Sequence, residues 1–235
     1  MTSRLFFIHH SCYLWEGNDA FLLFDYAGEG DVGSLLKESP NKPLYILATH
    51  SHSDHFSPSV FEEFQQHYGG CKYIFHSELK GIVGNKANTT FLNTGETYSD
   101  TFLKIKAFGS TDIGGSFFCE VQGLKMFHSG DLNNWHWNEE ANDDYITQYE
   151  NDWKRELRVL SKGIQYLDLL MFPTDLRLGR DYLKGLQELL AKITVKYLAP
   201  MHLNGVLDPK ELEELAHKEH SVLLLPYPYI SRQLL

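Results

Sequence analysis

Cysteine is scarce in this 235-residue chain. Its three cysteines, Cys12, Cys71 and Cys119, lie far apart and form no C-x-x-C pair. This spacing argues against a thiolate zinc site and against a disulfide framework. We expect three reduced side chains that pack in the core, as in a protein of a reducing compartment. The prediction is a cytoplasmic protein.

Basic residues are also few, because 21 Lys and Arg face 31 Asp and Glu and the formal net charge is −10. Proteins that bind a phosphate backbone normally carry a basic surface, so we expect no nucleic-acid partner. A metal-mediated phosphate contact stays open. The sequence shows neither a secretory leader nor an apolar run of membrane-spanning length, so we expect a soluble protein without a membrane partner.

Two common catalytic motifs are missing. The chain contains neither the G-x-S-x-G elbow of serine hydrolases nor the G-x-x-x-x-G-K-[ST] loop of P-loop proteins. Neither mechanism therefore has support. Hydrophobic residues make up 43% of the chain, which is ordinary for a globular protein. We predict a single domain over residues 1–235.

A dense group of metal-binding side chains stands out instead. His50, His52, Asp54 and His55 form the pattern H-x-H-x-D-H. Imidazole and carboxylate donors without thiolate suit zinc first, with manganese and iron as alternatives. Solvent-exposed histidines without a ligand role are the usual alternative for such a loop. This cluster, however, is internal and directly follows an apolar run, which argues against that alternative.

The elements around the motif favour a rigid loop. Residues 43–48 form an apolar run that predicts a buried strand, and Ser57-Pro58 predicts the start of a helix that reaches about His67. Further along, the pattern predicts mostly strands and then an alternation of helices and strands. The expected strands are 4–26 (as a meander), 72–75, 101–108, 117–121, 125–127, 167–172, 195–198 and 222–225, and the expected helices are 32–37, 142–160, 181–193 and one begun by Asp208-Pro209. Residues 81–100 read as turns.

Two more candidate ligands follow strands. Asp131 comes after Gly130 near the end of one strand, and His202 lies just past the end of another. Either residue alone would more often be structural. Behind H-x-H-x-D-H, in this order, both become candidates.

With these motifs the chain resembles the metallo-β-lactamase superfamily, from His10-Ser11 through the H-x-H-x-D-H loop and Gly130-Asp131 to Met201-His202. The opening meander and Phe172-Pro173-Thr174-Asp175 resemble the ascorbate-6-phosphate lactonase-like branch. The resemblance implies an α/β fold, the four-layer αβ/βα sandwich of that superfamily. His10-Ser11 could lie beneath the metal site as support for the ligands.

The resemblance also implies a ligand set for one or two divalent ions. His50 and His52 would bind a first metal, Asp54, His55 and His202 would bind a second, and Asp131 would bridge them. The family normally adds a third histidine for the first metal in the loop after the strand at 101–108.

In this sequence Ser110 occupies the position of that third histidine. A serine hydroxyl is a much weaker ligand, so we expect a weaker or open first site. Asp112 and His136 are the candidates to repair it. The second site keeps its full set of ligands and should bind metal more tightly.

The predicted activity is metal-dependent hydrolysis of an ester, lactone or phosphoester of a small molecule, by a metal-activated water. Asp54 is the candidate to orient that water and to take its proton. Asp175, Arg177 and His136 are candidate substrate-binding residues, and Arg177 could pair with an anionic substrate, although a surface ion pair is an equally good interpretation.

Several alternatives remain open. A phosphodiesterase or nuclease of the same fold would use a similar metal clamp, although the acidic balance disfavours it. A metal-binding relative whose first site decayed at Ser110 is the non-enzymatic alternative, and an iron oxidoreductase ranks last. Trp135 and Trp137 either line the pocket or, in the favoured interpretation, anchor the long helix at 142–160.

Overall fold

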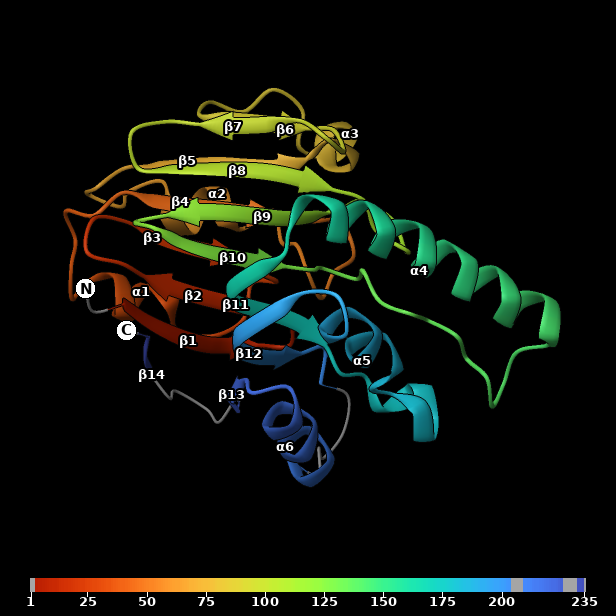
Figure 1. Ribbon diagram of the computed structural model, residues 1–235. Helices are drawn as coiled ribbons and strands as arrows, with labels where there is room; N and C mark the ends of the chain where they lie inside the picture. Colours follow the sequence, from red (N-terminus) through yellow and green to blue (C-terminus); the bar gives the residue numbers. More distant parts are fainter. Residues whose placement is uncertain (1–2, 204–208, 226–231, 235) are drawn as a thin grey trace.

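A computed structural model describes residues 3–203, 209–225 and 232–234 and contains two seven-stranded sheets (Figure 1). The first sheet has the strand order β14-β1-β2-β3-β4-β5-β6 and the second has the order β13-β12-β11-β10-β9-β8-β7. Each sheet therefore comes almost wholly from one half of the chain. The exception is β14, which pairs antiparallel with β1 and closes the edge of the first sheet.

The strands have the following bounds. The first sheet contains β1 (Ser3–His9), β2 (Cys12–Glu16), β3 (Phe21–Phe24), β4 (Leu44–Ala48), β5 (Cys71–His76), β6 (Thr89–Leu92) and β14 (Arg232–Leu234). The second contains β7 (Thr97–Ser99), β8 (Leu103–Phe108), β9 (Ser116–Val121), β10 (Leu124–His128), β11 (Tyr166–Pro173), β12 (Thr194–Met201) and β13 (Val222–Leu223).

Helices cover the outer faces of both sheets (Figure 1). The first sheet carries α1 (Val32–Leu36), α2 (Val60–Phe64), the 3-10 turn η1 (Ser77–Leu79) and α3 (Lys80–Val83). The second carries α4 (Asp143–Gly163), the 3-10 turn η2 (Leu176–Asp181), α5 (Lys184–Leu190) and α6 (Pro209–Lys218). The layers are thus helix, sheet, sheet, helix, which confirms the predicted αβ/βα sandwich.

Strand alternation explains why the layers hold together. In β2, Tyr13 and Trp15 face the second sheet, whereas Leu14 faces the helices, and all three are buried. Both faces of the sheet are therefore apolar, as expected for a sheet covered on both sides. On the far side, Trp153 and Leu157 of α4 pack into the outer core of the second sheet.

The carboxyl ends of several strands meet at one edge of the sandwich. In the first sheet β3, β4 and β5 are parallel, and β1 runs in the same direction because β2 is antiparallel to both β1 and β3. In the second sheet β10, β11 and β12 are parallel. Loops that follow such strand ends are the usual location of a site in α/β folds.

Several sequence-based boundaries were wrong. The predicted helix from Ser57 to about His67 is only α2, because Gln65 ends it after five residues. The helix predicted over 181–193 is shorter than expected, since α5 covers only Lys184–Leu190. The separate 3-10 turn η2 precedes it and contains a kink at Gly179, whose φ is 72°. Residues 81–100, predicted as turns, include β6 and β7. The predicted cap Asp208 lies outside the described residues.

Two further expectations bear on chemistry. The three cysteines are free, with Cys12 and Cys119 buried and Cys71 partly buried, as predicted. Within the described part of the chain, every helix is too short or too polar to cross a membrane.

Candidate metal centre

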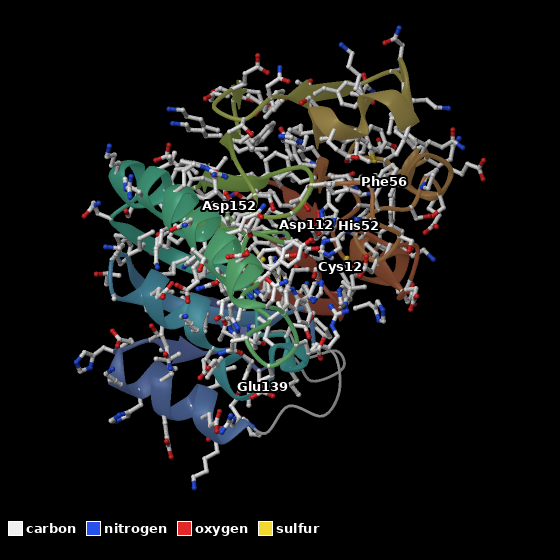
Figure 2. The ribbon with its side chains drawn as sticks, turned by 90° about the vertical axis from the view of Figure 1, so that its right-hand side faces the viewer. Cys12, His52, Phe56, Asp112, Glu139 and Asp152 are labelled. Atoms are coloured by element: carbon white, nitrogen blue, oxygen red, sulfur yellow. The ribbon has the colours of Figure 1, made fainter. Side chains whose placement is uncertain are left out.

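Three strand ends deliver the predicted ligands to one place. Thr49 and His50 directly follow β4, Asp131 follows β10 after two residues, and His202 directly follows β12. The site therefore lies where the two sheets meet at their carboxyl edge. Figure 2 shows the labelled His52 of this cluster between the first sheet and α4.

Asp131 is the central carboxylate of the cluster. Its Oδ1 lies 3.1 Å from His55 Nε2 and 3.4 Å from His202 Nε2, and its Oδ2 lies 3.4 Å from His50 Nε2. One carboxylate thus contacts residues from both predicted half-sites. This position between them is the one that a bridging ligand requires.

The separations fit a metal ion. Ligands about 2.0–2.1 Å from a tetrahedral zinc lie roughly 3.3–3.4 Å from one another, close to the separations measured around Asp131. Both His55 Nε2 and Asp131 Oδ1 are buried without hydrogen-bonding geometry to any described residue. Such orphaned polar atoms are costly unless a further group binds them. The donor set, nitrogen and oxygen only, suits zinc, iron or manganese.

The second half-site consists of Asp54, His55 and His202, and its histidines are held by buried carboxylates. His55 Nδ1 lies 2.7 Å from Asp25 Oδ2, and His202 Nδ1 lies 2.8 Å from Asp175 Oδ2. Each contact turns Nε2 of its histidine toward Asp131. A carboxylate behind a histidine fixes the ring orientation and raises its basicity as a metal ligand.

Asp25 also holds the H-x-H-x-D-H loop in place. Its carboxylate accepts hydrogen bonds from the backbone N–H and the hydroxyl of Thr49, at 2.8 and 2.7 Å. Thr49 Oγ1 in turn lies 3.0 Å from His50 Nδ1. Burial alone would raise the pKa of Asp25, but His128 and His55 hold that pKa below its ordinary value.

The loop is packed against glycines that admit no side chain. A Cβ on Gly114 would lie 2.2 Å from the Thr49 carbonyl oxygen and 2.5 Å from His50 Cβ. A Cβ on Gly130 would lie 2.7 Å from Thr49 Oγ1. Both glycines adopt positive φ, at 75° and 53°. Gly114 therefore serves close backbone packing.

The first half-site, His50 and His52, is more open. The His52 side chain is 47% exposed, and its Nδ1 lies 3.1 Å from His50 Nε2. Asp112 Oδ2 lies 3.8 Å from the same Nδ1, whereas Ser110 Oγ accepts a hydrogen bond from the Asp112 N–H. Figure 2 shows the labelled His52 and Asp112 as neighbours. The geometry therefore favours Asp112 as the residue that compensates for Ser110.

The structure does not bring His136 to the cluster. Its side chain is buried, its Nε2 lies 3.2 Å from the Asp181 carbonyl oxygen, and its Nδ1 accepts from the Asn138 N–H. Both ring nitrogens are therefore occupied elsewhere. The structure therefore does not support the hypotheses that His136 repairs the first half-site or binds substrate.

Asp175 also differs from its predicted place. Its side chain is fully buried, and it contacts His202 and Arg177 rather than facing a substrate. Burial opposes its ionisation, but His202 and Arg177 hold its pKa well below the usual range. Asp175 therefore orients His202, while Arg177, 54% exposed, is the member of the pair that faces the pocket.

The buried carboxylates of this cluster favour positive charge on their neighbours. Burial works against protonation of His55, yet its contacts with Asp131 and Asp25 outweigh burial and raise its pKa to about 10. Burial would likewise raise the pKa of Asp131, but His50 and His55 hold it well below the usual range. A cation is thus favoured at this position.

A cavity of about 300 Å³ opens directly onto the ligands. His52, Asp54, Asp112, Asp131 and His202 form part of its wall, and the remainder is polar, aromatic or basic. That remainder includes Trp135, Trp137, Tyr149 and Arg177. Trp135 also belongs to the outer core cluster that includes residues of α4, and Trp137 packs against that cluster. They therefore line the pocket and contribute to the core that holds α4, the two roles considered in the sequence analysis.

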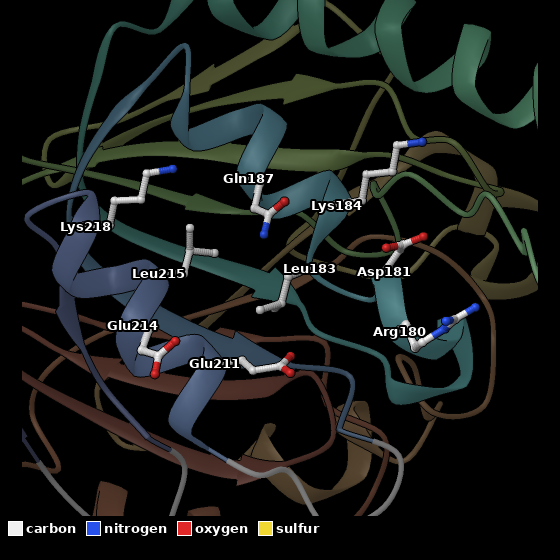
Figure 3. Close-up of a pocket in the computed structure, with 9 residues that line it drawn as sticks. All are labelled: Arg180, Asp181, Leu183, Lys184, Gln187, Glu211, Glu214, Leu215 and Lys218. Atoms are coloured by element: carbon white, nitrogen blue, oxygen red, sulfur yellow. The ribbon is translucent and has the colours of Figure 1, made fainter.

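A second, larger cavity of about 370 Å³ lies between η2, α5 and α6 (Figure 3). Its charged side chains have mixed sign, because Arg180, Lys184 and Lys218 line it together with Asp181, Glu211 and Glu214. No histidine or cysteine is among its nine labelled lining residues. The smaller cavity, which holds the ligand cluster, is therefore the better candidate site.

Sequence reasoning missed Asp25, although a signal for it exists. Asp25 directly follows β3, so it lies at the same strand edge as the ligands. Its φ of 45° is unusual for a residue other than glycine, and such strain is concentrated at functional sites. The sequence shows the strand end but not the fold of the backbone there.

Comparison with known proteins agrees with this geometry. A model of the β-lactamase superfamily domain matches residues 4–202, which span all the proposed ligands. A UPF0173 metal-dependent hydrolase of Natranaerobius thermophilus is 25% identical over 206 residues, which cover 84% of this chain and 79% of that protein.

Solved structures share the fold. Igni18, a metallo hydrolase from Ignicoccus hospitalis, superposes with a TM-score of 0.72 at 14% identity and covers 99% of this chain and 98% of its own. CmlA, a diiron β-hydroxylase from Streptomyces venezuelae, gives 0.68 at 10% identity and covers 99% of this chain and 54% of its own. Fold, strand-edge site and family match together show that this chain belongs to the β-lactamase superfamily.

Proposed function

We propose that this protein is a metal-dependent hydrolase of a small anionic ester, lactone or phosphoester, with zinc as the first candidate metal. The observation that carries the proposal is the cavity that exposed Arg177 lines together with Asp131 and other members of the ligand cluster. The name of the Natranaerobius relative, a metal-dependent hydrolase, supports it. Membership of the ascorbate-6-phosphate lactonase-like branch remains a prediction.

Arg177 is the residue proposed to recognise the substrate. Its Nε donates to both oxygens of buried Asp175, at 3.1 and 2.9 Å, and its guanidinium carbon lies 6.0 Å from the centre of the Trp137 ring. The side chain is thus held in one position while part of the guanidinium stays free for an anion. A planar guanidinium matches a carboxylate or phosphate group.

Bound metal would supply Lewis acidity, which activates water and polarises the scissile carbonyl or phosphoryl group. The side chains of the cavity position the water, accept its proton and exclude bulk solvent. Asp54, whose side chain is 48% exposed and lines the cavity, orients the attacking water and accepts its proton. Trp135 and Trp137 exclude bulk water from one side of the cavity, which strengthens the electrostatic interactions there.

The alternatives use the same residues differently. A phosphodiesterase would place a phosphate between the two half-sites, but the net charge of −10 disfavours a polynucleotide substrate. A decayed relative would bind metal without turnover. The nearness of Asp112 to His52 supports a repaired site over a decayed one. CmlA is named a diiron enzyme, so iron remains a candidate metal for this chain.

The first test is metal content per chain by elemental analysis of untagged protein, for wild type and His202→Asn. Asparagine tolerates the positive φ of 59° at this position, so the backbone is spared. We expect one to two metals per chain in wild type and a loss in the variant. His217→Asn, on the exposed face of α6, is the matched control.

The second test is turnover of a panel of anionic lactones, carboxylic esters and phosphodiesters. We expect hydrolysis that chelation abolishes and that zinc, manganese or iron restores. Metal-loaded protein without turnover on any class would favour the decayed relative. Failure to bind zinc, manganese and iron would refute the proposed mechanism altogether.

A further inference from the structure

His10 lies inside the ligand cluster, although it belongs to none of the expected ligand positions. It follows β1 directly and adopts a left-handed φ of 47°. Its carbonyl oxygen accepts a hydrogen bond from the His202 N–H at 3.1 Å. His202 has a left-handed φ as well, so two strained residues are joined through their backbones. Strain of this kind is tolerated where the surrounding structure requires it.

The His10 ring points at the second half-site. Its centre lies 4.2 Å from the His202 ring and 5.6 Å from the His55 ring, and its Nε2 lies 3.3 Å from Asp54 Oδ2. One ligand atom each from His10, Asp54, His55 and His202 falls within 4.8 Å of the others. The side chain is only 10% exposed.

The His10 donor atom lacks a partner that would explain its position. Nε2 is buried and makes no geometrically acceptable hydrogen bond within the described residues. A buried polar atom of this kind is costly unless a further group binds it.

We propose that His10 is a direct metal ligand of the second half-site, in addition to Asp54, His55, His202 and the bridging Asp131. The inference rests on the proposed metal centre and deepens it. It assigns the second half-site three imidazoles and two carboxylates, which suits a five-coordinate zinc, cobalt or iron ion. Metal should therefore fill this half-site first.

The competing explanation is that His10 only donates a hydrogen bond to Asp54. Two variants separate the two roles. His10→Gln retains a donor near the position of Nε2 but is a poor metal ligand. His10→Asn tolerates the left-handed backbone but is too short to reach Asp54. His9→Asn, at the neighbouring 48% exposed histidine, is the control.

The measurement uses cobalt as the metal. Affinity is obtained by competition with a chromophoric chelator, and exchangeable N–H signals shifted by the paramagnetic ion count the bound imidazoles. We expect both His10 variants to bind cobalt at least about tenfold more weakly and to lose one shifted N–H signal, with His9→Asn unchanged. Circular dichroism confirms that each variant is folded.

Two results would overturn the inference. Unchanged affinity and signal count in both variants would remove His10 from the ligand set. Normal binding by His10→Gln with weakened binding by His10→Asn would leave only the hydrogen-bond role. Because the readout is binding, it is separable from turnover. A His10-dependent cobalt site without hydrolysis would refute the proposed activity alone, and hydrolysis with a His10-independent site would refute this inference alone.

Discussion

The two halves of the metal centre differ in burial and in support. His55 and His202 have side-chain exposures of 0% and 4%, and each has a carboxylate behind it. His52 and Asp112, in the other half, are 47% and 41% exposed. In the first half buried His50 is joined by exposed His52, whereas in the second half both histidines are buried and only Asp54 is exposed, at 48%. The second half is therefore the more preorganised of the two.

This difference indicates where a missing ligand can be tolerated. Ser110 stands where the family resemblance implies a histidine, in the first half, where water could complete the coordination of a metal. In the second half the same loss would leave buried groups without partners, which costs about 1–3 kcal/mol for each group. We therefore expect the two half-sites to bind metal with unequal affinities, and the following changes test that difference.

The largest effect is expected from His202→Asn, which removes a ligand of the buried half. We expect kcat/KM to fall by more than about 100-fold, the upper range for the loss of an outer hydrogen-bond partner, because a ligand itself is lost. Steady-state kinetics with saturating zinc measures it. A fall of less than tenfold would contradict the assignment of His202.

Asp175→Asn should have the next largest effect. It keeps the shape of the side chain but removes the charge that orients His202 through Nδ1. We expect metal affinity to weaken by about 10–100-fold, as for other carboxylates behind ligand histidines. Chelator competition gives the value. If affinity stays at the wild-type level, the carboxylate is only a partner for Arg177.

Arg177→Gln should affect substrate rather than metal. Glutamine can still donate a hydrogen bond to Asp175, so the buried carboxylate is not left alone. We expect KM for an anionic substrate to rise by about tenfold, equal to about 1.4 kcal/mol of binding, with unchanged metal affinity. Arg180→Gln, a neighbour on η2 that is 92% exposed, should leave KM unaltered.

Asp112→Asn should weaken only the open half. An amide oxygen is a poorer ligand than a carboxylate, and His52 is already solvated. We expect about a two- to fivefold loss of affinity for the second metal equivalent and none for the first. Calorimetric titration with zinc resolves the two equivalents. Equal weakening of both would show that the halves are not independent.

The smallest effect is expected at the opposite edge, where Asp100 accepts hydrogen bonds from Lys72, Tyr45 and Tyr98. Partial burial opposes its ionisation, but Lys72, the Phe102 N–H and both tyrosines hold its pKa well below the usual range. A lowered folded-state pKa contributes stability above the ordinary value of about 3.9, and this contribution is lost as the pH falls through the folded-state pKa.

Asp100→Asn should therefore lower the free energy of unfolding by about 1 kcal/mol at pH 7, after allowance for solvent screening. The difference from wild type should shrink as the pH falls below about 4. Urea unfolding at pH 7 and pH 3 measures both values. Metal affinity should stay unchanged, which would separate general stability from the effects at the site. A difference that grows toward acid pH would contradict the sign.

Apolar runs of strand length predicted most of the strands, whereas the sandwich was implied by the resemblance to the metallo-β-lactamase superfamily. The same runs placed His50, Asp131 and His202 after strands, and the structure brings these three together. The helix predicted over 181–193 was too long, since α5 covers only Lys184–Leu190. Helical periodicity records which residues are apolar but not where the backbone turns.

The residue types and the H-x-H-x-D-H spacing indicate the kind of ligand and, through the family resemblance, the fold class. Only the folded chain shows which carboxylates and histidines meet. Asp25 and Asp175 lie 150 residues apart, yet both end behind ligand histidines, and His10 approaches Asp54 from the first strand. The physical reason is that strand direction and register set these distances, and both depend on pairing between distant segments.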